Sequence, residues 1–312
     1  MNAYPFGRKD ALINIYDGTV DKGVSRVLLE GKYLFDTIDC ESDLSKYKLL
    51  ILPDTVRLDK ALTEKVEAFI KAGGKVLATG TSGLKCDCDE FAIDFGAKFV
   101  GKSKFEPAYL KPNFETGYKK SAFVIYSPSF DIEATDGKVI IEKENPYFNR
   151  TTLSFSSHRQ TPNDPSESFP AAVINENGAY IGAALFTEYA QHGSLISKRM
   201  LTGVIDMLLG ESKTVVTTLP AQGVVTLREQ KAENRLILHA LYASPVKRGE
   251  GVEIIEDIIP IYGTEFSVKL DRAPARMYSA PDMKEIPFTY ENGTLKFTAE
   301  KIDCHLMAVM EF

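Results

Sequence analysis

The sequence predicts an α/β domain with a doubly wound parallel sheet, interrupted by a loop-rich insertion and followed by an all-β sandwich. Apolar runs alternate with amphipathic segments near the start of the chain, which is the pattern of βα units. The region from about 96 to 170 loses this alternation and is rich in Pro, Phe, Tyr and Ser. From residue 214 onward, short apolar runs are separated by Gly, Pro and Asn, as in a sandwich. We therefore place one domain at 1–213 and a second at 214–312.

The alternation of strands and helices begins at the N-terminus. The run KYKLLILPD is continuously apolar until Pro53, as expected of a buried parallel strand. The following helix keeps its apolar residues on one face and ends at two glycines. Such an order predicts parallel strands joined by right-handed crossovers. The expected elements are a strand at 11–17, a helix and then a strand within 24–39, a strand at 46–54, a helix at 62–74 and a strand at 75–80.

After the insertion, the chain returns to the first domain. The segment 169–186 predicts two strands around Glu176-Asn177-Gly178, because Asn-Gly favours a tight hairpin turn. The segment 194–210 predicts a helix with one apolar stripe that ends at a glycine. A TIM barrel is excluded, because that fold needs about 250 residues of regular βα alternation.

Composition excludes several classes of partner. The chain has 312 residues, with 37 Lys and Arg against 43 Asp and Glu, which disfavours binding along nucleic-acid phosphates. No apolar run approaches the ~18 residues of a membrane span, and the N-terminus does not resemble a signal peptide. Four cysteines in a chain of this length are not a disulfide framework, so we expect a reducing, cytoplasmic compartment. Without a glycine-rich phosphate loop, we also expect no cofactor.

Gly80-Thr81-Ser82-Gly83 follows a predicted strand, at the position where α/β enzymes often carry a nucleophile. A hydroxyl of Thr81 or Ser82 needs a neighbouring base, because it does not lose its proton near neutral pH. Two interpretations remain open. The chain is either a hydrolase of amides or esters that uses Ser82, or it has a structural turn whose small residues let the backbone bend. We favour the structural turn.

Two further groups of polar residues have alternative interpretations. Cys86 and Cys88 supply two thiolates, but a closed zinc site needs four ligands, and Cys40 and Cys304 have no partner spacing. We therefore expect no bound metal. Asp54 follows a buried strand at the carboxyl edge of the predicted sheet, where ligands bind in such folds. An Asp after a strand is also a common turn and cap residue, and we favour that role.

The segment PYFNRTTLSFSSHRQTP (146–162) combines Arg150, His158 and Arg159 with several aromatic residues. Long ordered loops in compact domains tend to be functional. The segment could therefore contact another subunit, extend over a neighbouring active site, or simply cover the edge of the sheet. We regard these three residues as candidate binding residues.

The first domain resembles the flavodoxin-like fold of class I glutamine amidotransferases. In that family a Cys stands on the turn after the corresponding strand, and a His follows a late strand. Here Thr81 and Ser82 occupy the place of the Cys, and Thr187 lies near the place of the His, whereas Glu188 is retained. The nearest imidazole, His192, lies four residues further on. The resemblance therefore implies a vestigial site at Thr81, Ser82 and Glu188.

The whole chain resembles the non-barrel part of a group of bacterial glycoside hydrolase-like proteins. In that group a TIM barrel is followed by a domain similar to the beta-galactosidase trimerisation domain and then by a β-domain. The segments that carry the likeness are KYKLLILPDTVRLDKALTEKVEAFIKAGGKVLATGTSGL, NPYFNRTTLSFSSHRQTP, LPAQGVVTLREQ, NRLILHALYASPVKRGEGVEIIEDIIPIY, ARMYSAPDMKEIPFTYENGTLKF and HLMAVME.

This resemblance implies that the catalytic carboxylates lie in a barrel that is absent from this chain. Glycoside cleavage needs two acidic residues at a fixed gap across the sugar ring, and nothing in the sequence predicts such a pair. The leading interpretation is a non-catalytic accessory region that self-associates as a trimer or dimer and works with the missing barrel. The alternatives are a module that binds a carbohydrate or small metabolite, and the Ser82-dependent hydrolase.

Overall fold

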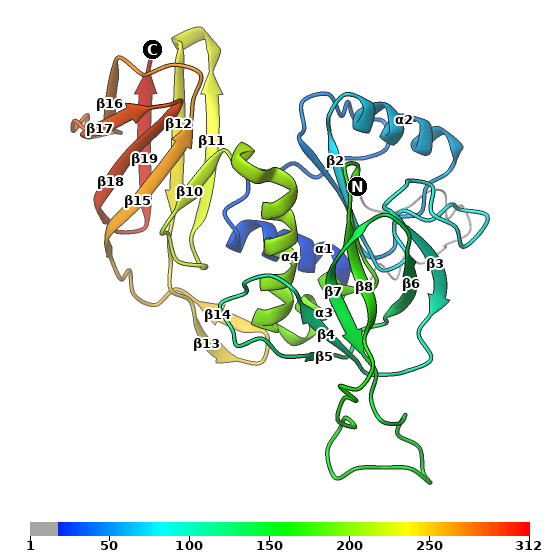
Figure 1. Ribbon diagram of the computed structural model, residues 1–312. Coiled ribbons are helices and arrows are strands. Elements are labelled where there is room, and N and C mark those ends of the chain that lie inside the picture. The colour runs from blue at the N-terminus through cyan, green and yellow to red at the C-terminus, as the bar shows by residue number, and fades with distance from the viewer. Residues whose placement is uncertain (1–17) are drawn as a thin grey trace, which may run out of the picture. The chain divides into compact units, whose positions relative to one another are not determined.

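The computed structural model describes residues 18–312, which form two compact units (Figure 1). The first unit comprises the described residues up to Val27 together with Thr37–Gly210, and the second comprises Leu28–Asp36 and Glu211–Phe312. The strand predicted at 11–17 lies outside the described residues. Among the described residues, no helix is long and apolar enough to cross a membrane.

The first unit contains one mixed sheet of seven strands. Three neighbouring strands, β1, β2 and β9, are parallel, and every pairing beyond β9 is antiparallel. The strands lie in the order β1 (Leu49–Leu52), β2 (Lys75–Thr79), β9 (Gly178–Ile181), β8 (Phe169–Ile174), β7 (Lys138–Glu144), β4 (Ala108–Pro112) and β5 (Phe123–Ile125).

The predicted doubly wound parallel sheet, and with it the flavodoxin-like and class I amidotransferase-like fold, is wrong. The chain is mostly β, and four of the seven strands in this sheet pair only in antiparallel fashion. Two causes explain the error. The stretch 31–39 forms neither helix nor strand, although a parallel strand was predicted to follow the first helix. In addition, β4, β5 and β7 of the predicted insertion join the main sheet, where their backbone groups find hydrogen-bond partners.

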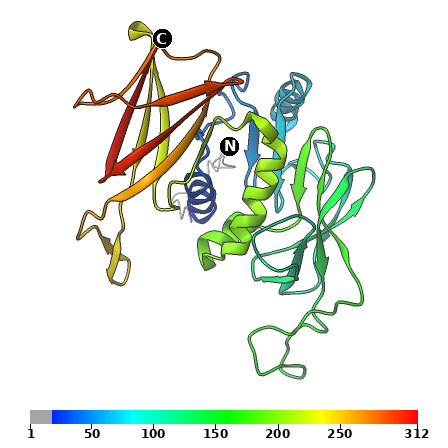
Figure 2. The ribbon, with the colours of Figure 1, turned by 60° about the vertical axis from the view of Figure 1, so that its left-hand side comes forward.

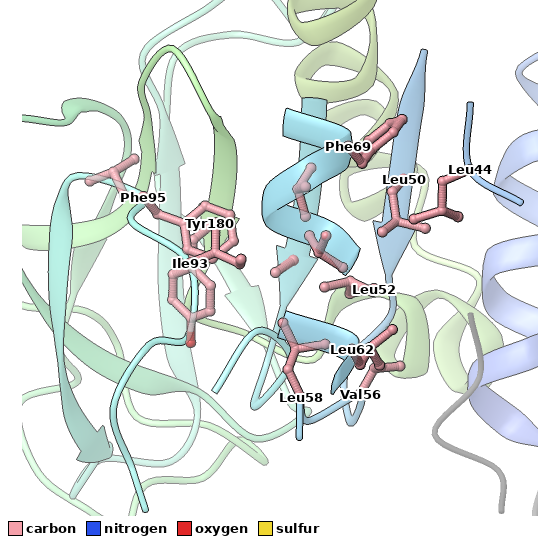
Figure 3. Close-up of a cluster of buried hydrophobic side chains, with 14 of the residues drawn as sticks. Leu44, Leu50, Leu52, Val56, Leu58, Leu62, Phe69, Ile93, Phe95 and Tyr180 are labelled. Carbon is pink, nitrogen blue, oxygen red and sulfur yellow. The ribbon is translucent and has the colours of Figure 1, made fainter. Parts of the chain in front are cut away.

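The parallel strands are covered by helix α2 (Lys60–Lys71), which forms where the sequence predicts a helix. The side chain of Asp59 caps its N-terminus by accepting a 2.8 Å hydrogen bond from the N–H of Leu62. Apolar side chains from this helix and from β1 and β2 form one core (Figure 3). Tyr180 of β9 enters the same core from the sheet. The other helices are α1 (Thr19–Glu30), α3 (Leu185–His192) and α4 (Leu195–Leu209).

The chain between β7 and β8 forms a long projecting loop, which we call the 145–168 loop. In both views it extends well away from the strands of its own unit (Figures 1 and 2). The strands on either side of it are neighbours in the main sheet, so its two ends start close together. The remaining strands of this unit, β3 (Ala97–Lys102) and β6 (Phe130–Ala134), form a separate two-stranded ribbon.

The second unit contains two four-stranded antiparallel sheets whose apolar residues share one core. A ribbon of β13 (Val246–Gly249) and β14 (Val252–Ile254) branches from it and carries exposed aliphatic side chains. One sheet has the order β10 (Val215–Thr217), β15 (Ile261–Lys269), β18 (Thr294–Ile302) and β17 (Phe288–Glu291), and the other β11 (Val224–Gln230), β12 (Arg235–Leu241), β19 (His305–Glu311) and β16 (Arg276–Ser279).

Candidate functional site

The end of β1 places Asp54 in the interior of the first unit. Its backbone has φ +51°, a left-handed conformation that Asp tolerates better than most residues with a Cβ. The residue is buried. Its backbone N–H donates a 2.8 Å hydrogen bond to the Thr79 hydroxyl at the end of β2. The position at a strand end is the predicted one, but the side chain points into the protein and is enclosed there.

The carboxyl group of Asp54 joins three elements through what we call the Asp54 cluster: Asp54, Thr79 and Thr187. The Thr79 hydroxyl donates to Oδ1 at 2.6 Å, and the backbone N–H and hydroxyl of Thr187 both donate to Oδ2 at 2.7 Å. Thr187 lies in the first turn of α3, where free N–H groups need acceptors and Ala184 has no side chain that could cap them. Asp54 therefore caps α3 from a distant part of the chain.

The electrostatics of the cluster follow from its burial. Burial raises the pKa of Asp54, and hydrogen bonds from Thr79 and Thr187 oppose this rise. Burial, helped by the nearby Asp54, also raises the pKa of Tyr180, whose hydroxyl donates to the carbonyl of Gly80 at 2.5 Å. The hydrogen bonds of Asp54 and Tyr180 stabilise the turn after β2.

The turn after β2 uses its hydroxyl groups for the backbone. Thr81 is half-buried and donates to the Asp54 carbonyl from both its N–H, at 2.7 Å, and its hydroxyl, at 3.1 Å. Ser82 is fully buried, and its Oγ accepts the backbone N–H of Val56 at 2.8 Å. Gly80 has φ +62°, and a Cβ there would lie 2.5 Å from the Asp54 carbonyl oxygen. The turn thus needs glycine at position 80 and a hydroxyl acceptor at position 82.

We expect Ser82→Ala to lower the free energy of unfolding by about 2 kcal/mol, because the buried N–H of Val56 loses its acceptor. Thr81→Ala is the matched control and should cost less, because its hydroxyl bond is longer and half-buried. Urea unfolding compares the two variants. Labelling of the intact chain by a serine-directed probe at Ser82 would contradict this structural role, since a fully buried hydroxyl does not meet such a probe.

Glu188, the other candidate, lies in α3 and is buried. Its Oε2 accepts the backbone N–H groups of Tyr126 and Ser127, at 3.1 and 2.7 Å. The imidazole of His192 is 3.9 Å from the same oxygen and packs edge-on against the Tyr126 ring. Glu188 therefore fixes the segment between β5 and β6 to the helix.

Tyr126 connects this helix to the 145–168 loop, although no sequence pattern singled it out. The guanidinium of Arg159 lies 4.6 Å from the centroid of the Tyr126 ring, and the Tyr126 hydroxyl donates to Oε1 of Gln160 at 2.8 Å. The structure therefore brings two predicted residues, Glu188 and Arg159, to the same tyrosine. The Asp54 cluster lies after the ends of β1 and β2 instead, and its member Thr187 is part of α3.

The base of the 145–168 loop is tied to the sheet. The Tyr109 hydroxyl donates to the Thr161 carbonyl at 2.5 Å, and the side-chain amide of Asn163 donates to Glu144 at 2.5 Å. Glu144 is buried and also pairs with Lys111 at 2.9 Å. These contacts hold both ends of the loop, so the projecting part starts from a fixed base.

The outer part of the loop carries the remaining candidates. Arg150 donates to the Arg159 carbonyl at 2.8 Å and so links the two sides of the loop. His158 is exposed. Leu153 is 93% exposed and Phe155 is 71% exposed, which are higher values than those of the other exposed large apolar side chains among the described residues. Exposed apolar side chains on a loop whose base is fixed are candidates for an interaction surface.

The cysteines do not gather into a site. All four are free, with Cys86 and Cys304 exposed and Cys40 and Cys88 partly buried. Among residues 18–312, no group of three or more His, Cys, Asp and Glu side chains is arranged to hold a metal ion.

Comparisons with known proteins identify related regions. Residues 26–96 match the family model of the beta-galactosidase trimerisation domain. The chain is 46% identical to alpha-L-fucosidase isoenzyme 2 from Paenibacillus thiaminolyticus, with a TM-score of 0.92 over 96% of this chain and 46% of the fucosidase. This chain thus spans less than half the length of that enzyme. No curated protein matches the chain.

Two beta-galactosidases share the fold at low identity. The enzyme from Bacillus circulans sp. alkalophilus is 16% identical, with a TM-score of 0.55 over 95% of this chain and 37% of its own. Gan42B, a GH42 beta-galactosidase from G. stearothermophilus, is 14% identical, with a TM-score of 0.58 over 95% of this chain and 36% of its own. Residues 26–96 are therefore similar to a trimerisation domain associated with glycoside hydrolases, as the sequence resemblance predicts, and the two beta-galactosidases show that the fold is shared over most of the chain.

Proposed function

We propose that this chain is the accessory, non-catalytic region of a carbohydrate-active enzyme and that it joins copies of that enzyme through the 145–168 loop. The observation that carries the proposal is the exposed apolar tip of this loop, at Leu153 and Phe155, on a base that is tied to the sheet. The match of residues 26–96 to a trimerisation domain supports self-association, as a trimer or dimer.

The bonding partners of the buried acidic side chains support a non-catalytic role. Hydrolysis of a glycoside needs two carboxyl groups on opposite sides of the scissile bond. In this chain Asp54 caps α3, Glu188 holds the backbone at Tyr126 and Ser127, and Glu144 pairs with Lys111, so all three buried acids of the described residues have structural partners inside the protein. We therefore propose that the catalytic barrel is a partner outside these residues, and that the enzyme they serve is a glycoside hydrolase related to beta-galactosidases or fucosidases.

We expect the purified chain to be an oligomer and the double variant Leu153→Ser, Phe155→Ser to weaken its association about a thousandfold. Each of these side chains contributes about 1.5–3 kcal/mol when it is buried, and about 1.4 kcal/mol corresponds to a tenfold change in affinity. Light scattering on a sizing column measures the molar mass over a range of concentrations.

The matched control is Ile255→Ser, Ile258→Ser, which makes the same kind of change at two exposed aliphatic residues of the second unit. This variant should keep the oligomer. A wild-type chain that stays monomeric at every concentration, or a loop variant with unchanged mass, would contradict the proposed role of the loop. Glycoside turnover that copurifies with the isolated chain would contradict its non-catalytic role.

A further inference from the structure

Two histidines lie together on the sheet formed by β11, β12, β19 and β16 in the second unit. His239 is on β12 and pairs in register with Met307 of β19, so His305, two residues before Met307, points to the same face. The alternate residues Leu238, Ala240 and Ala308 belong to the core between the two sheets. The two imidazoles therefore project from the outer face of the sheet, from strands that the core holds in place.

The two rings meet through nitrogen atoms. Nδ1 of His239 is 3.0 Å from Nε2 of His305, the ring planes differ by 13°, and the centroids are 5.3 Å apart. With the nitrogens at this distance, 5.3 Å is nearly the largest separation that the centroids can have. The rings therefore lie edge to edge in nearly one plane and share one N–H···N hydrogen bond, in which at least one ring is neutral and accepts.

We propose that His239 and His305 bind a divalent transition-metal ion of the kind that imidazole prefers, such as Cu²⁺, Ni²⁺ or Zn²⁺. Such an ion lies about 2.0–2.1 Å from an imidazole nitrogen, along the lone pair of that nitrogen, so the two rings, whose nitrogens face each other at 3.0 Å, must turn slightly about their side-chain bonds to bind one ion together. The ring that donates the shared hydrogen bond then carries its proton on its other nitrogen, which leaves both facing nitrogens free to bind the ion. Water supplies the other positions, because among the described residues no third acidic, His or Cys ligand joins the pair.

The surroundings set the strength of this site. His305 is exposed and His239 is half-buried, so an ion reaches both rings from solvent. The strands fix the spacing of the ligands before the metal arrives, which favours binding. Arg228 opposes it, because its positive charge acts on His239. This inference concerns the second unit and is independent of the role proposed for the 145–168 loop.

Isothermal titration of the full chain with NiCl₂, ZnCl₂ and CuCl₂ tests the proposal. We expect one ion per chain, and at least about tenfold weaker binding in His239→Gln and in His305→Gln, because each variant loses one of two protein ligands. His158→Gln, which changes an exposed histidine of the other unit, should bind as the wild type does. Arg228→Gln should bind more tightly, since it removes the opposing charge.

Thermal unfolding of each protein with and without metal gives a second measurement and shows that each variant folds. Should the half-buried His239 prove necessary for folding, the exposed His305→Gln variant carries the test. The proposal is overturned if the wild type binds none of the three ions, or if His305→Gln binds them as tightly as the wild type. Light scattering on the same samples reports the oligomer separately, so failure of one proposal does not affect the other.

Discussion

Replacement of Glu188 by alanine is expected to lower the free energy of unfolding by about 3 kcal/mol. The backbone N–H groups of Tyr126 and Ser127 lose their shared acceptor, in a place that is partly buried at Tyr126 and buried at Ser127. A hydrogen bond to a carboxylate contributes about 1.5–3 kcal/mol, and a buried donor without a partner adds its own cost. Glu188→Gln keeps one oxygen that can accept both N–H groups, so we expect it to cost only about 1 kcal/mol.

The effect should spread from Glu188 to the 145–168 loop. Tyr126 holds Arg159 through its ring and Gln160 through its hydroxyl, so a looser Tyr126 releases one side of the loop. We expect Glu188→Ala to increase amide hydrogen exchange in this loop, and chemical unfolding to measure the loss of stability. Glu67→Ala, at an exposed position of α2, is the control and should change stability by less than about 0.5 kcal/mol. Equal effects of the two alanine variants would contradict the anchoring role.

Local sequence patterns predicted the elements that depend on local physics. The apolar run before Pro53 forms β1, the Asn-Gly turn joins β8 to β9, and the amphipathic segment 194–210 forms α4. Each of these signals lies within a few residues of the structure it determines. The region 96–170 was expected to be a loop-rich insertion, and the partners of its strands were not predicted, because pairing between distant strands leaves no trace in either segment alone.

The candidate site shows the same limit. Position after a strand predicted that Asp54 would act at a turn or cap, and it does cap a helix. The cap belongs to α3, however, and Thr187 is 133 residues further along the chain. Because the cap comes from a distant residue, the N-cap position of α3 is occupied by Ala184 and not by the usual Ser, Thr, Asp or Asn. That missing residue is the one sequence signal that could have pointed to an external partner.

Replacement of Asp54 by alanine should lower the free energy of unfolding by about 4 kcal/mol, because three donors from Thr79 and Thr187 lose their acceptor. The left-handed backbone adds to this cost, since alanine at φ +51° is strained by about 1 kcal/mol. Asp54→Gly loses the same hydrogen bonds but is free of the backbone strain, so it should be the more stable of the two variants. Chemical unfolding of both variants separates the contributions. An alanine variant as stable as the wild type would contradict the capping role.

The pH dependence gives the cluster an independent test. Since burial raises the pKa of Asp54, the folded protein holds the proton on this acid more strongly than the unfolded chain does. Its contribution to stability is complete below the ordinary pKa of aspartate and is lost as pH rises through the raised pKa. Asp54→Asn carries no charge at any pH, so its stability relative to the wild type should improve as pH rises above the ordinary pKa of aspartate, about 4. The opposite trend would mean that the donors of Thr79 and Thr187 outweigh burial and hold the carboxylate ionised.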